Sequence, residues 1–135
     1  MNQELIQFIE IKEVLKMHDM IIEILGGKSG IHSKELLESA LNHPLMIIDY
    51  GESHEKTIPY LTATYFYHII KNHPFCDGNK RTGLLTALKF LQKNNYHILI
   101  TAQLYDDLYE LALNTAASKI TKQEIASFFK TIILK

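Results

Sequence analysis

Apolar residues recur along this chain at intervals of three or four positions, in runs separated by residues that start or stop helices. The first run extends from Ile11 to Leu25, includes His18 among its core-facing positions, and is followed by a Gly-Gly pair that supplies a C-terminal stop. Pro59 suits the first turn of another helix, whose broad apolar face continues to Asn72 and is predicted to be buried. This periodicity predicts an all-α fold.

Between these two helices the sequence predicts a shorter helix and a loop. Ser33 can cap the helix, and the segment ending at Pro44 stops it, because the residue before a proline disfavours helical geometry. The chain between Met46 and Thr57 is polar and contains glycine, a composition typical of surface loops. We predict a flexible flap here, before the third helix.

Three more helices are predicted towards the C-terminus. One follows Asn79 and closes at Asn94, a second is capped by Thr101, and Thr121 opens a capping box ahead of the last. The short apolar run 97–100 is predicted to be extended. The expected architecture is therefore all-α, with about six helices.

Composition limits the domain organisation and the partners. The chain has 135 residues, is 47% hydrophobic and shows no repeat or shift in composition, so one domain covering residues 1–135 is expected. Lys and Arg total 14 against 15 acidic residues, and the lysines are dispersed, so direct nucleic-acid binding is not expected.

The compartment is predicted from what the sequence lacks. The longest mostly apolar stretch, around Tyr60 to Ile70, falls short of the ~20 residues that span a bilayer, so no membrane segment is expected. Cys76 has no partner for an internal disulfide, and the N-terminus does not resemble a signal peptide. A cytoplasmic location is therefore expected.

Residues 73–82 have the sequence His-Pro-Phe-Cys-Asp-Gly-Asn-Lys-Arg-Thr, which we call the motif. The N–H groups of Gly78, Asn79 and Lys80 begin a predicted helix, so they lack intrahelical partners and carry the positive end of its dipole. Gly78 has no Cβ and lets an anion approach, while the Asn79 side chain can add a donor. Lys80 and Arg81 supply cations for a polyphosphate. A nucleotide is the natural ligand.

Two further residues of the motif suggest chemistry on that nucleotide. Asp77 is a hard oxygen ligand placed to hold Mg²⁺ between two phosphate groups. Histidine is the side chain most often used as a general base, and His73 could accept a hydroxyl proton as that oxygen attacks phosphorus. Phe75 is more plausible as an inward anchor. Each feature alone is commonly structural, but their conjunction favours phosphoryl or nucleotidyl transfer.

The motif resembles the signature of the Fic/Doc superfamily: His-Pro-Phe, any residue, an acidic residue, Gly-Asn, then Gly or Lys, and Arg. This similarity implies the all-α Fic/Doc core, with ATP and Mg²⁺ as cofactors and an antitoxin as inhibitor. It also implies roles for six residues: His73 as base, Asp77 on the metal, and Gly78, Asn79, Lys80 and Arg81 around the phosphates.

Two departures from the AMP-transferring members are Doc-like. Lys80 stands where those enzymes usually have glycine, and Leu84 stands where they have a second arginine. Resemblance to death-on-curing (Doc) toxins implies transfer of the γ-phosphate to a threonine of elongation factor Tu, which stops translation. It also implies that the flap, Ile47 to Lys56, holds the protein substrate beside the site.

Two alternatives remain open. The same residues could perform AMP transfer to a protein hydroxyl, or the chain could be a non-catalytic regulatory module that retains the phosphate site. The other histidines match no zinc pattern, and His68 is expected to be a core residue.

Overall fold

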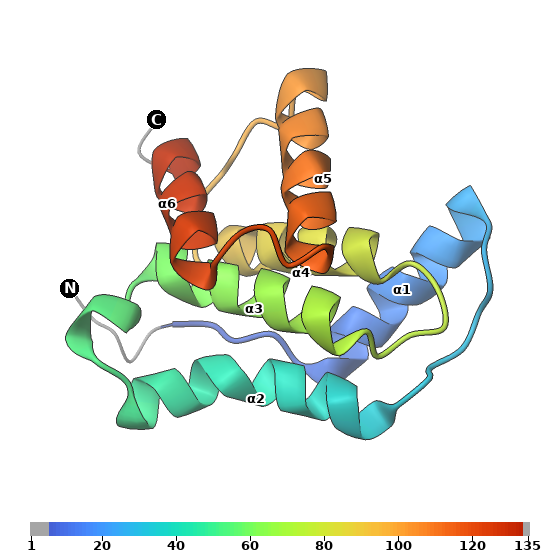
Figure 1. The fold of residues 1–135 in the computed structure, drawn as a ribbon, viewed down its shortest axis with the longest axis horizontal. Coiled ribbons are helices and arrows are strands. Elements are labelled where there is room, and N and C mark those ends of the chain that lie inside the picture. Colours follow the sequence, from blue (N-terminus) through green and yellow to red (C-terminus); the bar gives the residue numbers. More distant parts are fainter. Residues whose placement is uncertain (1–5, 134–135) are drawn as a thin grey trace.

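The computed structural model describes residues 6–133, which form six α-helices and one 3-10 turn (Figure 1). Their bounds are α1 Ile11–Leu25, α2 Lys34–Tyr50, η2 Ser53–Glu55, α3 Ile58–Asn72, α4 Asn79–Lys93, α5 Ala102–Ala116 and α6 Lys122–Ile133. No β-strand occurs within residues 6–133. The β-type pairing in this part of the chain consists of an isolated bridge between Ile31 and Phe75. The all-α prediction with six helices is confirmed.

Helix α3 is the central element of the fold. It packs against α2, α4 and α6, and Figure 1 shows α2 along one side of it with α5 and α6 on the opposite side. The side chains of Tyr65, Phe66 and Ile69 are fully buried, as the broad apolar face of this helix predicted. Because α3 leads directly into the motif, its burial fixes where the motif begins.

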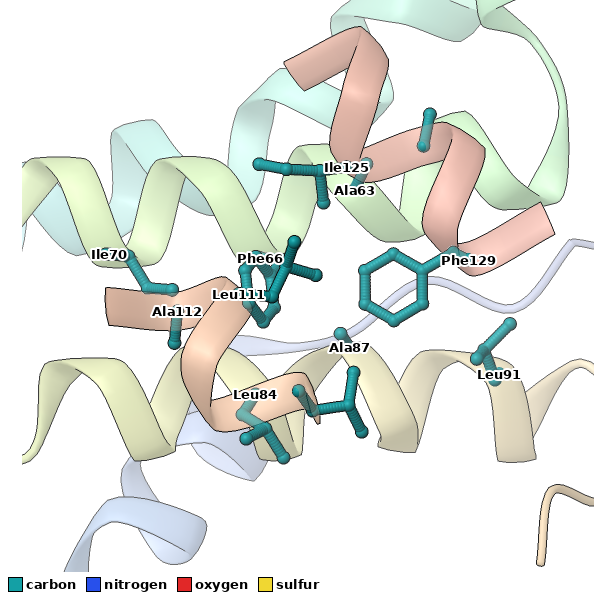
Figure 2. Packing of buried hydrophobic residues seen from close by; sticks show 12 residues of the cluster. Ala63, Phe66, Ile70, Leu84, Ala87, Leu91, Leu111, Ala112, Ile125 and Phe129 are labelled. Atoms are coloured by element: carbon teal, nitrogen blue, oxygen red, sulfur yellow. The ribbon is translucent and has the colours of Figure 1, made fainter. Parts of the chain in front are cut away.

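Two hydrophobic clusters hold α3 and α4 together. The first joins α3 to α4, α5 and α6, and Figure 2 shows Phe66 and Phe129 facing each other in it, with ring centroids 5.6 Å apart at an edge-on angle of 74°. The second joins α1, α2, α3 and α4, and in it the rings of Tyr65 from α3 and Phe90 from α4 lie 5.0 Å apart. Buried area of this kind stabilises by about 25 cal/mol per Å².

The predicted helix caps are present. The hydroxyl groups of Ser33 and Thr101 accept hydrogen bonds from the N–H groups of Leu36 and Leu104, both at 3.1 Å. At the start of α6 the expected capping box is formed: Thr121 N–H donates to the Glu124 carboxylate at 2.9 Å, and Glu124 N–H donates to the Thr121 hydroxyl at 3.1 Å. Each cap satisfies donors that the first helical turn leaves unpaired.

The prediction that the second helix ends at Pro44 is wrong. Helix α2 continues through Pro44 to Tyr50, and the proline lies buried inside it. A proline removes one backbone hydrogen bond from a helix, but its ring here extends the apolar face that Leu37, Ala40 and Leu41 present to the core. The tertiary packing of that face outweighs the local signal.

The loop predicted before the third helix is present but shorter than expected. Residues 46–50 are helical, Gly51 ends α2, and the connection to α3 contains the turn η2, with a capping box between Glu52 and Glu55. This loop sits at the N-terminal end of α3, whereas the motif begins at its C-terminal end. A 15-residue helix is about 22 Å long, which separates the two.

Two other predictions have different outcomes. Residues 97–100 form no strand and pair with none in the described part of the chain, so the expected extended segment is an unpaired connection between α4 and α5. The extent of the domain, residues 1–135, stays a prediction because residues 1–5 and 134–135 lie outside those described.

Candidate active site

The motif forms the connection between α3 and α4. His73 is the C-cap of α3, with φ 52° and ψ 55°, a left-handed conformation that is uncommon for a residue with a side chain. Its N–H donates to the Ile69 carbonyl at 3.2 Å, while its imidazole is exposed. The turn thus directs the predicted base away from the core and leaves it accessible to a substrate.

Phe75 anchors the motif, as its sequence predicted. Its ring is 1% exposed and stacks on the imidazole of His18 from α1, with centroids 3.8 Å apart and planes inclined by 9°. Its main chain is held by Asn79, whose side chain accepts from the Phe75 N–H and donates to the Phe75 carbonyl, both at 2.9 Å. Both hydrogen-bonding atoms of this carboxamide are therefore used within the protein.

The expected contact between the Asn79 side chain and phosphate needs correction for that reason. Asn79 is 4% exposed and both its side-chain oxygen and nitrogen bond Phe75, so the side chain is held in the buried turn and its backbone N–H is the better candidate for a ligand contact. The first backbone bond at this helix start runs from Thr82 N–H to the Gly78 carbonyl at 2.9 Å. The N–H groups of Asn79, Lys80 and Arg81 precede this bond and have no partner within the helix, an arrangement that suits the binding of an anion.

Asp77 lies exposed beside this helix start. Its carboxylate accepts hydrogen bonds from the N–H of Lys28 at 3.1 Å and the N–H of Gly78 at 2.9 Å. These two bonds lower the pKa of Asp77, and the bond from Lys28 has the larger effect. The positive charge of Lys80 acts in the same direction. The carboxylate is consequently ionised at neutral pH, as a metal ligand must be.

Gly78 makes the turn between the carboxylate and α4 possible. It is the N-cap of α4 and has φ 79°, a left-handed conformation for which glycine carries no steric penalty. A Cβ at this position would lie 3.6 Å from Ile22 and 3.7 Å from His18. The backbone here is thus one that a glycine adopts readily, while the role of Gly78 in letting an anion approach stays a prediction.

A segment that we had not predicted lies alongside the motif. The loop between α1 and α2, residues 26–33, pairs with it through N–H groups of His32 and Ser33, which donate to the Pro74 carbonyl at 2.7 and 2.9 Å. Cys76 N–H donates to the Gly30 carbonyl at 3.1 Å. The expectation that Ile47 to Lys56 flanks the site is wrong, because these residues lie at the other end of α3.

His18 is the second feature that the sequence did not reveal. It is 2% exposed, and its Nε2–H donates to the Asp77 carbonyl at 2.8 Å. On the helical pattern alone it counted as a core-facing member of α1, which it is. No signal in the sequence connects it with Asp77, which lies 59 positions away.

Arg81 extends the site towards α5. Its Nε–H donates to the Tyr105 hydroxyl at 3.2 Å, and its guanidinium carbon lies 4.9 Å from the centre of the Tyr109 ring. The hydrogen bond to Tyr105 is the main cause that raises the Arg81 pKa. The three side chains line a cleft of about 450 Å³, large enough for part of a nucleotide.

The donor set fits a magnesium ion better than a transition metal. Among the described residues no three His, Cys, Asp or Glu side chains gather in one place, and Asp77 is a single carboxylate with a lowered pKa. Mg²⁺ commonly binds proteins through one or two carboxylates and takes its other ligands from water and phosphate.

Outside this donor set, Cys76 is free and exposed. None of the described helices is long and apolar enough to cross a membrane.

Comparison with known proteins agrees with this arrangement. Residues 8–91 match the model of the Fic/DOC family, and the chain belongs to that family. It is similar to "Protein kinase doc" of Escherichia phage P1, with 26% identity over 121 residues that cover 90% of this chain and 91% of that protein.

A second relative is similar over a shorter segment. "Prephenate dehydrogenase" of Bacillus subtilis (strain 168) is 31% identical over 75 residues, which are 54% of this chain. The match spans only 20% of the dehydrogenase, so its activity gives no indication for this chain.

Proposed function

We propose that this protein transfers the γ-phosphoryl group of ATP to a hydroxyl group of a protein substrate. The observation that carries the proposal is the exposed Asp77 carboxylate at the start of α4, held between the N–H groups of Lys28 and Gly78. The proposal is supported because an ionised carboxylate that could hold a metal lies beside the N–H groups of a helix start, within a few residues of an exposed histidine. Phosphoryl-transfer sites recurrently combine a bound metal, groups that hold phosphate and a residue that orients or deprotonates the nucleophile.

In the proposed reaction His73 accepts the proton of the substrate hydroxyl. The substrate oxygen forms a bond to the γ-phosphorus, the bond from that phosphorus to the β–γ bridging oxygen breaks, and ADP leaves with the electron pair. Bound Mg²⁺ supplies charge neutralisation on the phosphates, and Asp77 is the residue that would hold it. The N–H groups at the start of α4, with Lys80 and Arg81, bind and orient the phosphate oxygens.

Two considerations favour γ-phosphoryl over AMP transfer. Leu84 is 1% exposed and packs in the core with Phe66 and Leu108, so this position contributes no cation to the nucleotide. The relative that matches most of the chain is named a protein kinase. AMP transfer by the same residues is the alternative outcome of the experiment below.

The protein substrate and the inhibitor are inferred from the resemblance to Doc toxins. A threonine of elongation factor Tu is the leading candidate acceptor, which would make this protein a cytoplasmic inhibitor of translation. A separate antitoxin chain would block the site. The test is incubation of purified elongation factor Tu with the protein and ATP, followed by mass spectrometry. A bacterial lysate serves in parallel, and modification of a different protein there would reassign the substrate.

The reaction itself is tested with ATP labelled separately at the α- and γ-phosphates, in the presence of Mg²⁺ and the lysate. We expect label from the γ-phosphate alone, and a loss of at least roughly 100-fold with His73→Ala, because a general base typically contributes that much. His97→Ala is the matched control, since His97 is also exposed but lies between α4 and α5. Label from the α-phosphate would mean AMP transfer, and no label would favour a binding module.

A further inference from the structure

Helix α1 contributes one polar side chain to the back of the motif. His18 is buried and makes two contacts there: its ring stacks on Phe75 at 3.8 Å, and its Nε2 lies 2.8 Å from the Asp77 carbonyl oxygen. Because a carbonyl oxygen can only accept, the proton of this bond is on Nε2. His18 is thus a donor to the main chain of the residue proposed to hold the metal.

This bond fixes the orientation of one peptide group. In a trans peptide the C=O and the following N–H point in opposite directions. Since the Asp77 carbonyl points to His18, the Gly78 N–H points away from the core, where it donates to the Asp77 carboxylate at 2.9 Å. Rotation of this peptide would therefore move both the Gly78 N–H and the carboxylate that it holds.

No other hydrogen bond that the structure records holds this carbonyl. Gly78, which has φ 79°, carries no Cβ, so the backbone beside this peptide is intrinsically able to rotate. A buried donor from α1 is what selects one orientation. Stacking alone would not do so, because a phenylalanine ring could pack on Phe75 without contacting the Asp77 oxygen.

We propose that His18 is a positioning residue of the candidate active site, which orients the Asp77–Gly78 peptide and through it the Asp77 carboxylate. The effect of this positioning on metal and nucleotide binding rests on the proposed function. Groups that orient metal ligands in this way typically change metal affinity 10- to 100-fold when replaced.

Three variants of the full chain separate this role from a merely structural one. His18→Phe keeps a flat ring for stacking but loses the donor. His18→Gln retains an N–H donor at similar reach. Tyr65→Phe is the matched control, because it removes another buried hydrogen bond in the same core, from the Ile9 N–H to the Tyr65 hydroxyl at 3.0 Å.

The measurement is binding of Mn²⁺, as a spectroscopic substitute for Mg²⁺, in the presence of ATP, together with thermal unfolding of each variant. We expect His18→Phe to weaken Mn²⁺ binding about 10-fold or more. His18→Gln should restore most of it, and Tyr65→Phe should lower stability without changing Mn²⁺ affinity. Unchanged binding by His18→Phe, or an equal loss in Tyr65→Phe, would overturn the proposal.

A second readout does not depend on the proposed function. The amide resonance of Gly78, followed by ¹⁵N NMR without nucleotide, reports the hydrogen bond to Asp77 directly. It should move in His18→Phe and return towards the wild-type position in His18→Gln. If the wild-type protein binds no Mn²⁺ with ATP, the proposed function fails, and this resonance still decides on His18: an unchanged position in His18→Phe would refute its positioning role.

Discussion

The carboxamide of Asn79 closes on the main chain of Phe75 through two hydrogen bonds, one in each direction and both at 2.9 Å. These residues are four positions apart, so the pair spans the turn that contains Asp77 and Gly78. The turn is thereby fixed at both ends, by Asn79 within the motif and by the buried ring of Phe75 against α1. The exposed groups of His73 and Asp77 depend on this frame for their positions.

Asn79→Ala should therefore destabilise the protein as well as disable it. The substitution leaves the buried N–H and carbonyl of Phe75 without partners, which costs on the order of 2–4 kcal/mol for two lost bonds. Urea unfolding measures this loss. Asn42→Ala, at an exposed position of α2, is the control and should change the unfolding free energy by no more than about 0.5 kcal/mol. Equal stability of both variants would contradict the framing role.

Two neighbouring glycines offer a matched test of the contact between the loop 26–33 and Asp77. A Cβ at Gly27 would lie 2.8 Å from Asp77 Oδ2, whereas a Cβ at Gly26 would meet nothing within 4 Å. Both glycines have positive φ, 114° and 83°, so Ala is conformationally strained at either position. Gly27→Ala should displace the carboxylate and reduce transfer from ATP at least about 10-fold, while Gly26→Ala retains most activity. Equal transfer rates for the two variants would show that the loop 26–33 does not control the position of the Asp77 carboxylate.

Tyr105 should influence the binding of ATP through Arg81. Tyr105→Phe removes the 3.2 Å hydrogen bond from Arg81 Nε–H and frees the guanidinium to adopt other orientations. We expect KM for ATP to rise a few-fold, by about 1 kcal/mol of binding energy, with a smaller change in kcat. Tyr50→Phe, at a side chain that is 84% exposed, serves as the control. If only kcat fell, Arg81 would be acting on the transition state instead.

The unfolding free energy should fall in mild acid because of a partly buried histidine outside the motif, His68 of α3. Burial, with smaller contributions from Lys122 and His43, lowers the pKa of His68 from 6.5 to about 3, and Lys122 Nζ lies 3.0 Å from its Nε2. Unfolded chains therefore bind a proton between these two values that the folded chain does not bind. Stability is fully present above about pH 6.5 and declines as the pH falls towards 3.

Urea unfolding at pH 7 and pH 4.5 measures this dependence, and His68→Phe should reduce it. His43, whose ring stacks on His68 at 3.6 Å, shares part of the effect because burial lowers its pKa too. His97→Phe at an exposed position is the control. An identical pH dependence in wild type and His68→Phe would exclude His68 as the cause.

Much of the fold was predictable because its signals are local. Helix starts at Ser33, Thr101 and Thr121 need only a side chain that bonds an N–H three residues later. The end of α1 needs only a glycine. The signal failed at Pro44, where the missing hydrogen bond is local but the burial that compensates for it is not.

The candidate site divides in the same way. The chain by itself determined the motif, its position between two helices, and the free N–H groups at the start of α4, because all of these lie within ten consecutive residues. Only the tertiary structure decided that Lys28 N–H reaches Asp77 across 49 positions, that His18 holds its carbonyl across 59, and that Tyr105 holds Arg81 across 24. Such contacts depend on how α1 and α5 pack against α4, and helical periodicity specifies which face of a helix is buried but not which residue it meets.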